Sequence, residues 1–207
     1  MDQDRWRRLM QRWSAPPSDQ VYTALTSAYS ESHRHYHTGR HIADCLAQLD
    51  SAGELATEPE EVELALWFHD AVYRPTSSKN ELRSAEWAQR FLDSVGADAT
   101  RSQRVFDHIL ATQHAAGSLS GDTALVVDID LSILGREPAE YDIYERAIRE
   151  EYRWVPGPIY RKKRAEILES FLARSVIYET RYFRETCEAR ARSNLRRAID
   201  ACDRPGC

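Results

Sequence analysis

The sequence predicts an all-α protein, a single bundle of about eight to ten helices. Apolar residues recur at helical spacing through the chain, with helix-starting and helix-ending residues between them. No segment alternates between apolar and polar residues with the period of two that is typical of a strand. Because 207 residues are enough for one large core, we expect one domain over residues 1–207. Its candidate site is expected in about residues 30–135, and helices in residues 138–201 complete the fold.

Two short helices are expected first. Trp6 and Trp13 share one face of a helix over residues 4–13, which Pro16-Pro17 ends. Ser18 is then expected to cap a second helix. The two tryptophans could stack on a ligand, but a seven-residue spacing on an amphipathic helix is far more typical of core packing.

The next helix contains two histidines four residues apart. The stretch from Tyr36 to Cys45 holds His37 and His41 and continues toward Gly53. Residues four apart share a helix face, so both imidazoles could point into one site. For His37 the plain alternative is a hydrogen bond to the backbone at the helix start.

Three residues just upstream carry further polar groups. His33 and His35 are expected to face solvent. Arg34 lies between them and could point inward as a phosphate ligand.

Two apolar segments contain acidic or imidazole side chains. A helix that opens at Pro59 ends in the pair His69-Asp70, and the segment 125–134 contains Asp128 and Asp130. Such groups rarely enter apolar segments without a partner or a metal ion. A closing Gly135 favours a helix over a buried strand for residues 125–134.

The remaining helices follow from their start and stop residues. The segment 78–81, Ser-Lys-Asn-Glu, is expected to form a capping box that opens a helix ending at Gly96. The next helix starts at Thr100 and ends near His114, which leaves this histidine beside a loop and free to face a substrate or to serve a structural role. His108 is assigned to the helix surface or the core. Later helices are expected to begin at Pro138, after the break at residues 156–158, and at about residue 184.

The chain contains His41, then the adjacent pair His69-Asp70, then the distant Asp130. This order resembles the ligand set of the HD superfamily of metal-dependent phosphohydrolases, and the resemblance covers roughly residues 30–200. The segment His37-x-x-x-His41-x-x-Asp44 is similar to the metal-site motif of cyclic-nucleotide phosphodiesterases, a branch of that superfamily. Residues 80–81, 128–135 and 149–152 resemble a bacterial group usually described only as predicted metal-dependent phosphohydrolases.

The resemblance implies a metal ligand set. Its four members are His41, His69, Asp70 and Asp130, with Asp128 as the fallback if the register differs by two residues. It also implies that His37 is a proton donor, a role that suits an imidazole because its ordinary pKa is about 6.5.

Two imidazoles and two carboxylates, with no thiolate, suit Mn²⁺, Mg²⁺, Fe²⁺, Co²⁺ or Ni²⁺ better than structural zinc held by cysteines. The residues expected to act in catalysis are His37, Asp70, Glu81 and His114. For Glu81 the capping role competes with catalysis. The residues expected to bind the phosphate are Arg34, Arg149 and Arg164, with Arg161 also in reach and an ordinary wetted helix face as the alternative for those in the later helices.

Composition limits the partners. A net charge of −5 argues against a dedicated nucleic-acid binder. All but three of the 28 basic residues are arginines, which suit phosphate recognition, although the coding bias of a GC-rich genome explains most of that ratio. The four cysteines lack CxxC spacing, the chain starts without a secretory signal and no apolar run approaches about 18 residues. We therefore expect a cytoplasmic protein without a membrane partner. The terminal Gly206-Cys207 does not fit a prenylation box, and a homo-oligomer is one of the states that the sequence leaves open.

The candidate ligand set and the resemblance to the HD superfamily together predict a metal-dependent phosphohydrolase. Its expected substrate is a small phosphorylated compound, a nucleotide cleaved at a phosphomonoester or pyrophosphate bond. The alternative is a non-catalytic protein on the same fold that binds a nucleotide or a metal ion for regulation. The intact ligand quartet favours catalysis. Cyclic-dinucleotide hydrolysis is disfavoured, because the Gly-Tyr-Pro phrase of that branch is missing.

Overall fold

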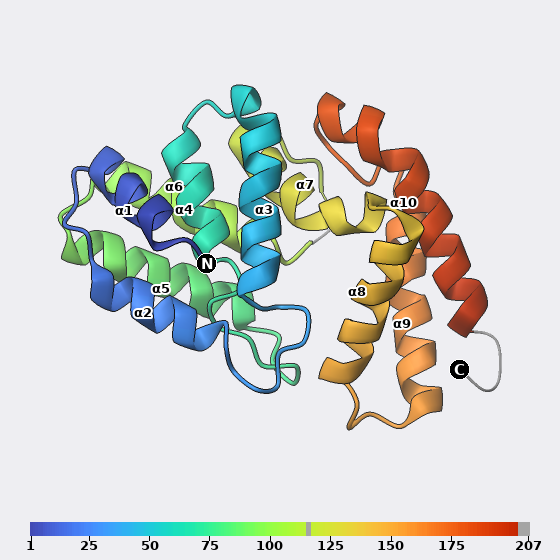
Figure 1. The fold of residues 1–207 in the computed structure, drawn as a ribbon. Coiled ribbons are helices and arrows are strands. Elements are labelled where there is room, and N and C mark those ends of the chain that lie inside the picture. Colours follow the sequence, from blue (N-terminus) through green and yellow to red (C-terminus); the bar gives the residue numbers. More distant parts are fainter. Residues whose placement is uncertain (115–116, 203–207) are drawn as a thin grey trace. The chain divides into compact units, whose positions relative to one another are not determined.

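The computed structural model describes residues 1–114 and 117–202, and Gly206-Cys207 lie outside the described residues. Within these ranges the chain forms ten α-helices and two short 3₁₀ helices, with no strand, as Figure 1 shows. The all-α prediction is confirmed. None of the helices in the described part of the chain combines the length and the apolar character that crossing a membrane requires.

Contacts within the chain define two compact units, Met1–Asp130 and Leu131–Cys207. The single domain expected from the sequence stays a prediction. The candidate site predicted from the sequence lies within the first unit, because its ligands run from His41 to Asp130.

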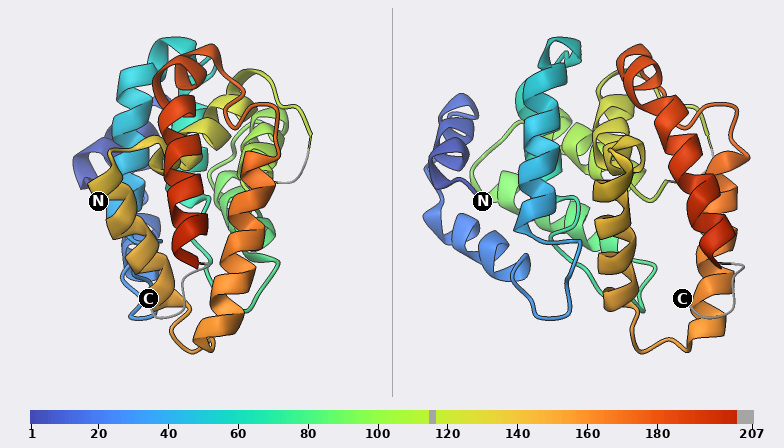
Figure 2. Two further views of the ribbon diagram at one scale, coloured as in Figure 1. Left: turned by 90° about the vertical axis from the view of Figure 1, so that its right-hand side faces the viewer. Right: turned by 45° about the vertical axis from the view of Figure 1, so that its right-hand side comes forward.

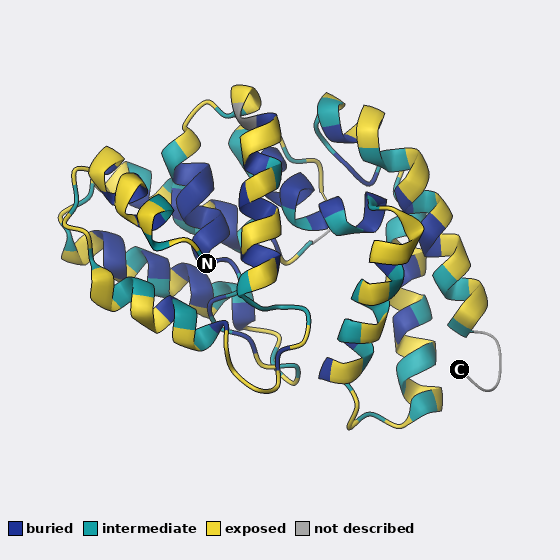
Figure 3. Cartoon of the chain, in the orientation of Figure 1, coloured by how far each residue is buried: buried dark blue, intermediate teal, exposed yellow. Residues whose placement is uncertain are grey.

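The first unit is built around one buried helix. Its elements are α1 (Gln3–Arg12), α2 (Asp19–Ala28), α3 (Gly39–Ala52), η1 (Gly53–Leu55), α4 (Pro59–Phe68), α5 (Asn80–Ser94), α6 (Ala99–Ala111) and α7 (Gly121–Asp130). Helix α4 contacts α1, α3, α5, α6 and α7. Every residue from Glu61 to Phe68 is buried, so α4 is the darkest helix of this unit in Figure 3. A helix that is apolar on nearly all sides is stable only when other helices surround it.

Aromatic side chains fill the core around α4. The Trp6 ring lies 5.5 Å from Trp67 and 5.8 Å from Phe91, measured between centroids. Trp6 is fully buried and Trp13 almost so. The prediction that both tryptophans pack in the core is confirmed.

One carboxylate on α4 is fully buried, and two arginines of α6 neutralise it. The oxygens of Glu61 lie 3.0 Å from Arg101 Nε and 2.7 Å from Arg104 Nε. Removing a charge from water is costly unless a partner of opposite charge is bonded to it. The two ion pairs join α6 to α4, the helix that His69 and Asp70 directly follow.

Two helix starts differ from the prediction. Ser18 precedes α2 but has a left-handed φ of 50°, and its hydroxyl donates to Pro16 O instead of capping the helix. Helix α5 begins at Asn80 without a side-chain cap. The Asn80 carboxamide instead bonds to the backbone N–H and carbonyl of Arg74. The expected capping box is therefore wrong, because this side chain stabilises the preceding loop.

The segment 125–134 is helical, as expected, but it is not one helix. Helix α7 ends at Asp130, and the 3₁₀ helix η2 (Leu131–Gly135) follows it. Gly135 is not a left-handed cap. A Cβ there would lie 2.6 Å from Cys187 Cβ, so the close approach of α10 (Arg181–Cys202) requires a glycine at this position.

The second unit contains η2, α8 (Pro138–Glu151), α9 (Gly157–Leu172) and α10, which Figure 2 shows from two further sides. Pro138 starts α8 as predicted, and α10 begins three residues earlier than expected. Helix α10 contacts the other three elements. Asn194 on α10 donates to the carbonyls of Leu134 and Arg136, which ties the end of η2 to this helix.

A buried histidine makes the stability of the first unit depend on pH. His108 was expected at the helix surface or in the core, and it lies in the core with 5% exposure. Its Nδ1 shares a hydrogen bond of 2.9 Å with the Thr123 hydroxyl. Burial lowers the pKa of His108, although Asp122, Glu61 and Asp107 act in the opposite direction. Its Nε2 is buried without a hydrogen-bond partner among the described residues.

Because the folded-state pKa of His108 lies below the unfolded value of about 6.5, the folded protein resists protonation at this site. We expect this contribution to the free energy of unfolding to be complete above about pH 6.5 and to fall as the pH decreases below it. Urea denaturation at about pH 7.5 and about pH 5.5 measures the effect. His108→Gln should lose less stability between the two pH values than the wild type, and an equal loss in both proteins would contradict the expectation.

Candidate metal centre

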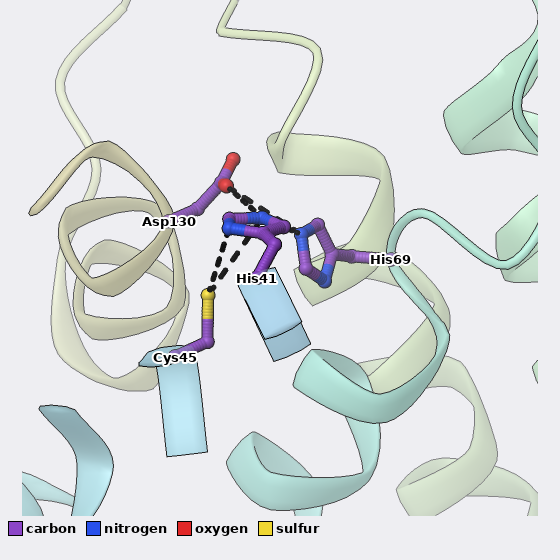
Figure 4. A group of neighbouring side chains, drawn as sticks. All are labelled: His41, Cys45, His69 and Asp130. Carbon is purple, nitrogen blue, oxygen red and sulfur yellow. Dashed lines mark hydrogen bonds and ion pairs between the residues drawn. The ribbon is translucent and has the colours of Figure 1, made fainter. Parts of the chain in front are cut away.

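Three helix ends bring the predicted ligands together. His41 lies in the first turn of α3, His69 directly follows α4 with Asp70 next to it, and Asp130 is the last residue of α7. The helices α3, α4 and α7 contact one another in all three pairings. Figure 4 shows the side chains of His41, His69 and Asp130 pointing toward one another from these elements.

Four donor atoms face a common point. His41 Nε2 lies 3.1 Å from His69 Nε2 and 3.1 Å from Asp130 Oδ1. Asp70 Oδ2 lies 3.1 Å from His69 Nε2 and 3.5 Å from His41 Nε2. The remaining nitrogen-to-oxygen distance, from His69 Nε2 to Asp130 Oδ1, is 3.4 Å.

These separations fit the ligands of one divalent ion. Ligands about 2.1 Å from a metal ion lie about 3.0 Å apart at a right angle and about 3.4 Å apart at a tetrahedral angle. The donor set also fits by charge, because two carboxylates balance one divalent cation. The distances from the two histidine nitrogens are therefore compatible with a metal ion, and the full set of four ligands stays a prediction.

Neighbouring groups hold the ligands in place. His69 Nδ1 donates to the Leu66 carbonyl at 3.0 Å, which leaves the Nε2 lone pair of His69 for a metal ion. Asp130 Oδ2, the oxygen that does not face the two ligand histidines, lies 3.0 Å from His114 Nε2. His114 has a left-handed φ of 54° just beyond the end of α6, as a residue in a turn rather than a helix. The structure thus brings His114 to the cluster through Asp130.

Burial and mutual attraction shift the pKa values of the cluster. Burial opposes the charged form of His69, but Asp70 and Asp130 outweigh it and hold the pKa of His69 well above its ordinary value. Burial likewise raises the pKa of Asp130, but His69, His114 and His41 outweigh it and lower that pKa well below its usual range. The pKa of Asp70 is lowered in the same way, against burial, by His69, His37 and His41. A metal ion must therefore compete with a proton on His69.

A thiol, which the ligand set expected from the sequence does not include, lies beside the cluster. The group His41, Cys45, His69 and Asp130 could hold a metal ion, since its donor atoms all lie within 4.8 Å of one another. Cys45 lies one helical turn after His41, and its Sγ is 3.7 Å from His41 Nδ1 and 3.8 Å from His41 Nε2 (Figure 4). An atom on the lone-pair axis of Nε2 would be much farther from Nδ1 than from Nε2. The thiol therefore lies beside the imidazole, and Asp70 as the fourth donor stays a prediction.

Cys45→Ser should leave the amount of bound manganese unchanged, because the four imidazole and carboxylate donors remain. Elemental analysis of the purified, manganese-loaded variant and wild type tests this. Loss of the ion from Cys45→Ser would make the thiol a ligand. It would also shift the expected metal from Mn²⁺ toward the softer zinc, which thiolates favour.

His37 lies near the cluster but not on the helix. Helix α3 begins at Gly39, and the Thr38 hydroxyl accepts a hydrogen bond from the Arg40 N–H just inside it. The expectation that His37 and His41 share a helix face is therefore wrong. The rings are nevertheless close, with centroids 6.2 Å apart, because the turn before α3 folds His37 back toward the cluster. His37 also stacks on Tyr73, 4.1 Å between centroids.

Arg34 points inward, as one of the expectations held, but its contacts differ from those expected. Its Nη1 donates to the Asp70 carbonyl at 2.6 Å and to the His37 carbonyl at 3.2 Å, and its Nη2 donates to the Ala71 carbonyl at 3.0 Å. Its Nε pairs with Glu31 at 3.0 Å. All three nitrogens are thus engaged within the protein, which corrects the expected phosphate contact. Arg34 instead ties the His37 turn to the backbone of the ligand Asp70.

The other predicted residues have different surroundings. Asp128 is fully buried, two residues from Asp130 and therefore on the opposite side of α7, which favours Asp130 as the distant ligand. Glu81 lies in the first turn of α5, and among the described residues it forms no hydrogen bond or ion pair. Arg149 and Arg164 belong to the second unit, so their contact with a substrate stays a prediction.

Two residues at the cluster had no functional role in the sequence reasoning. Tyr73 stacks on both His33 and His37, and the Arg34 guanidinium lies 5.5 Å from its ring. Its position three residues after Asp70 was the only signal. Cys45 was visible one turn after His41, but a thiol inside an apolar helix face is more typical of a core.

Comparisons of the chain with family models, with curated proteins and with solved structures gave no match.

Proposed function

We propose that this protein is a metal-dependent phosphohydrolase of the HD superfamily, acting on a small phosphorylated compound such as a nucleotide. The convergence of His41, His69, Asp70 and Asp130 carries the proposal, since each histidine Nε2 lies 3.1–3.5 Å from the other nitrogen and from both carboxylates. The order of these residues in the sequence matches the ligand order of that superfamily. When bound, a divalent ion in such a site supplies a polarised phosphoryl oxygen and an activated water.

The exposure of the cluster supports a small substrate. The histidine ligands are almost fully buried, whereas the carboxylates of Asp70 and Asp130 are each 14% exposed and His114 is 22% exposed. Only this edge can meet a substrate. A phosphate group fits through such an opening more easily than a folded protein does.

Two imidazoles outside the ligand set are assigned separate roles. His114 is a positioning residue, because it bonds to Asp130 Oδ2 and so fixes the direction of Oδ1, the oxygen that faces the ligand histidines. His37 is the proton donor to the leaving oxygen, because it lies within reach of the cluster and is held by the Tyr73 ring and by Arg34 on its carbonyl. Glu81 has no role in this proposal.

Hydrolysis of a panel of nucleoside mono-, di- and triphosphates, together with a generic phosphoester, tests the function. Purified protein is stripped with a chelator, reloaded with Mn²⁺ and assayed for released phosphate. We expect turnover that depends on the ion and is absent in Asp130→Ala. Stoichiometric metal binding without turnover of any substrate would favour the regulatory alternative instead.

A further inference from the structure

The second unit contains a cavity of about 500 Å³, lined by residues of α8, α9 and the C-terminal end of α10. This volume lies in the range of about 300–1,000 Å³ that is typical of small-molecule sites. All of its lining residues belong to residues 142–202, and none is a member of the metal cluster. The cavity is therefore a separate candidate site.

The wall of this cavity is strongly basic. It contains five arginines and two acidic residues, which are Arg146, Arg149, Arg161, Arg164, Arg197, Asp142 and Glu145. Arg164 pairs with Glu145 at 2.6 Å, and Arg197 pairs with Asp142 at 2.5 Å. These two pairs use both carboxylates. Three guanidinium groups of this wall, those of Arg146, Arg149 and Arg161, have no carboxylate partner among residues 1–114 and 117–202, in a chain whose net charge is −5.

Two of the three remaining guanidinium groups are free to bind a ligand. Arg149 is held by the Tyr152 carbonyl at 2.6 Å and lies 4.6 Å from the centre of the Tyr160 ring. The side chains of Arg146 on α8 and Arg161 on α9 form no hydrogen bond or ion pair within the described part of the chain. Two arginines on different helices that line one cavity suit the recognition of an anion, because each guanidinium can bond to two of its oxygens.

Tyr160 adds a donor to the same wall. Its hydroxyl is buried and has no hydrogen-bond partner among the described residues. Burial raises the pKa of Tyr160 to about 12, so the group keeps its proton at neutral pH. A buried O–H group without an acceptor costs free energy, and native structures rarely leave one.

We propose that this cavity binds a small organic anion through its phosphate group. Arg146 and Arg161 hold the phosphate oxygens, and a ligand oxygen supplies the acceptor that Tyr160 lacks. Ala198, Ala201 and the Tyr160 ring provide apolar surface for the organic part of the ligand. The site does not depend on the function proposed for the metal cluster.

Titration calorimetry with inorganic pyrophosphate tests the phosphate contact in the full-length protein. A chelator is kept in excess, so that no metal ion can bring the probe to the cluster. We expect saturable binding, and we expect Arg146→Gln with Arg161→Gln to weaken it about tenfold or more, because both charge-assisted contacts are lost. Arg153→Gln is the matched control, since Arg153 is an exposed arginine of the same unit that does not line the cavity.

The outcomes separate this site from the metal cluster. Asp130→Ala should bind pyrophosphate as the wild type does, and loss of binding there would overturn the proposal. Absence of binding to the wild type, or equal binding by the double variant, would overturn it as well. Citrate serves as a carboxylate probe, and binding as tight as that of pyrophosphate would show attraction by charge alone and reject the phosphate assignment. Circular dichroism verifies that the variants are folded, which we expect because neither arginine contacts another described residue through a hydrogen bond or ion pair.

Discussion

Asp130→Ala should lose its divalent ion and, with it, the hydrolysis that we propose. Asp130 Oδ1 lies 3.1 Å from one ligand nitrogen and 3.4 Å from the other, so it supplies a direct donor. Its removal also leaves one carboxylate to balance two positive charges. Loss of an outer-shell partner typically costs about 10–100-fold in metal affinity, and loss of a ligand should cost more than about 100-fold.

Elemental analysis after manganese loading and desalting measures this effect, together with phosphate release. Asp107→Ala is the matched control, because Asp107 is an exposed aspartate on α6 in the same unit. His114→Gln should fall between the two, since it removes only the hydrogen bond to Asp130 Oδ2. Full metal occupancy in a folded Asp130→Ala protein would show that the ligand set is wrong.

The candidate ligands could be selected from the sequence because they conflict with their local surroundings in it. His69 and Asp130 follow or end apolar helices in which a charged or imidazole group is costly. Such groups required a bonded partner or a metal ion, and the order of the residues along the chain suggested a metal ion. The choice between Asp128 and Asp130 could not be made from the sequence, because two residues change the side of a helix and the helix register depends on packing.

The residues around the ligands were harder to predict. Where α3 begins is decided by Thr38, whose hydroxyl bonds to the first-turn backbone, and the spacing of His37 and His41 contains no sign of this. Two of the partners of Arg34 are carbonyls more than 30 residues away, at Asp70 and Ala71. A backbone carbonyl leaves no trace in the sequence, so an inward arginine could equally be assigned to a phosphate.

The expected capping box shows the same limit for the fold. Residues 78–81 have the sequence of a capping box. The Asn80 carboxamide instead bonds to the backbone of Arg74, and α5 begins without a side-chain cap. Helix existence was predictable throughout, because apolar periodicity sums over many residues. Helix ends depend on one or two hydrogen bonds, and a single side chain can change them.

The variant His37→Gln should separate proton transfer from metal binding. His37→Gln should keep the full metal content, because the His37 ring does not belong to the four donors and is placed by stacking on Tyr73, 4.1 Å away. Turnover should fall about 10²–10⁴-fold, the usual contribution of a positioned general acid. Glutamine keeps a polar side chain of similar reach but has no proton to deliver at neutral pH.

His35→Gln is the control for this experiment, since His35 is an exposed histidine in the same segment, two residues earlier. Loss of the metal ion from His37→Gln would make this imidazole a ligand, which its position in the turn before α3 argues against. Unchanged turnover with full metal content would make it a bystander. In that case His114 would be the remaining imidazole at the exposed edge of the cluster, and its bond of 3.0 Å to Asp130 would have to serve both to orient a ligand and to transfer a proton.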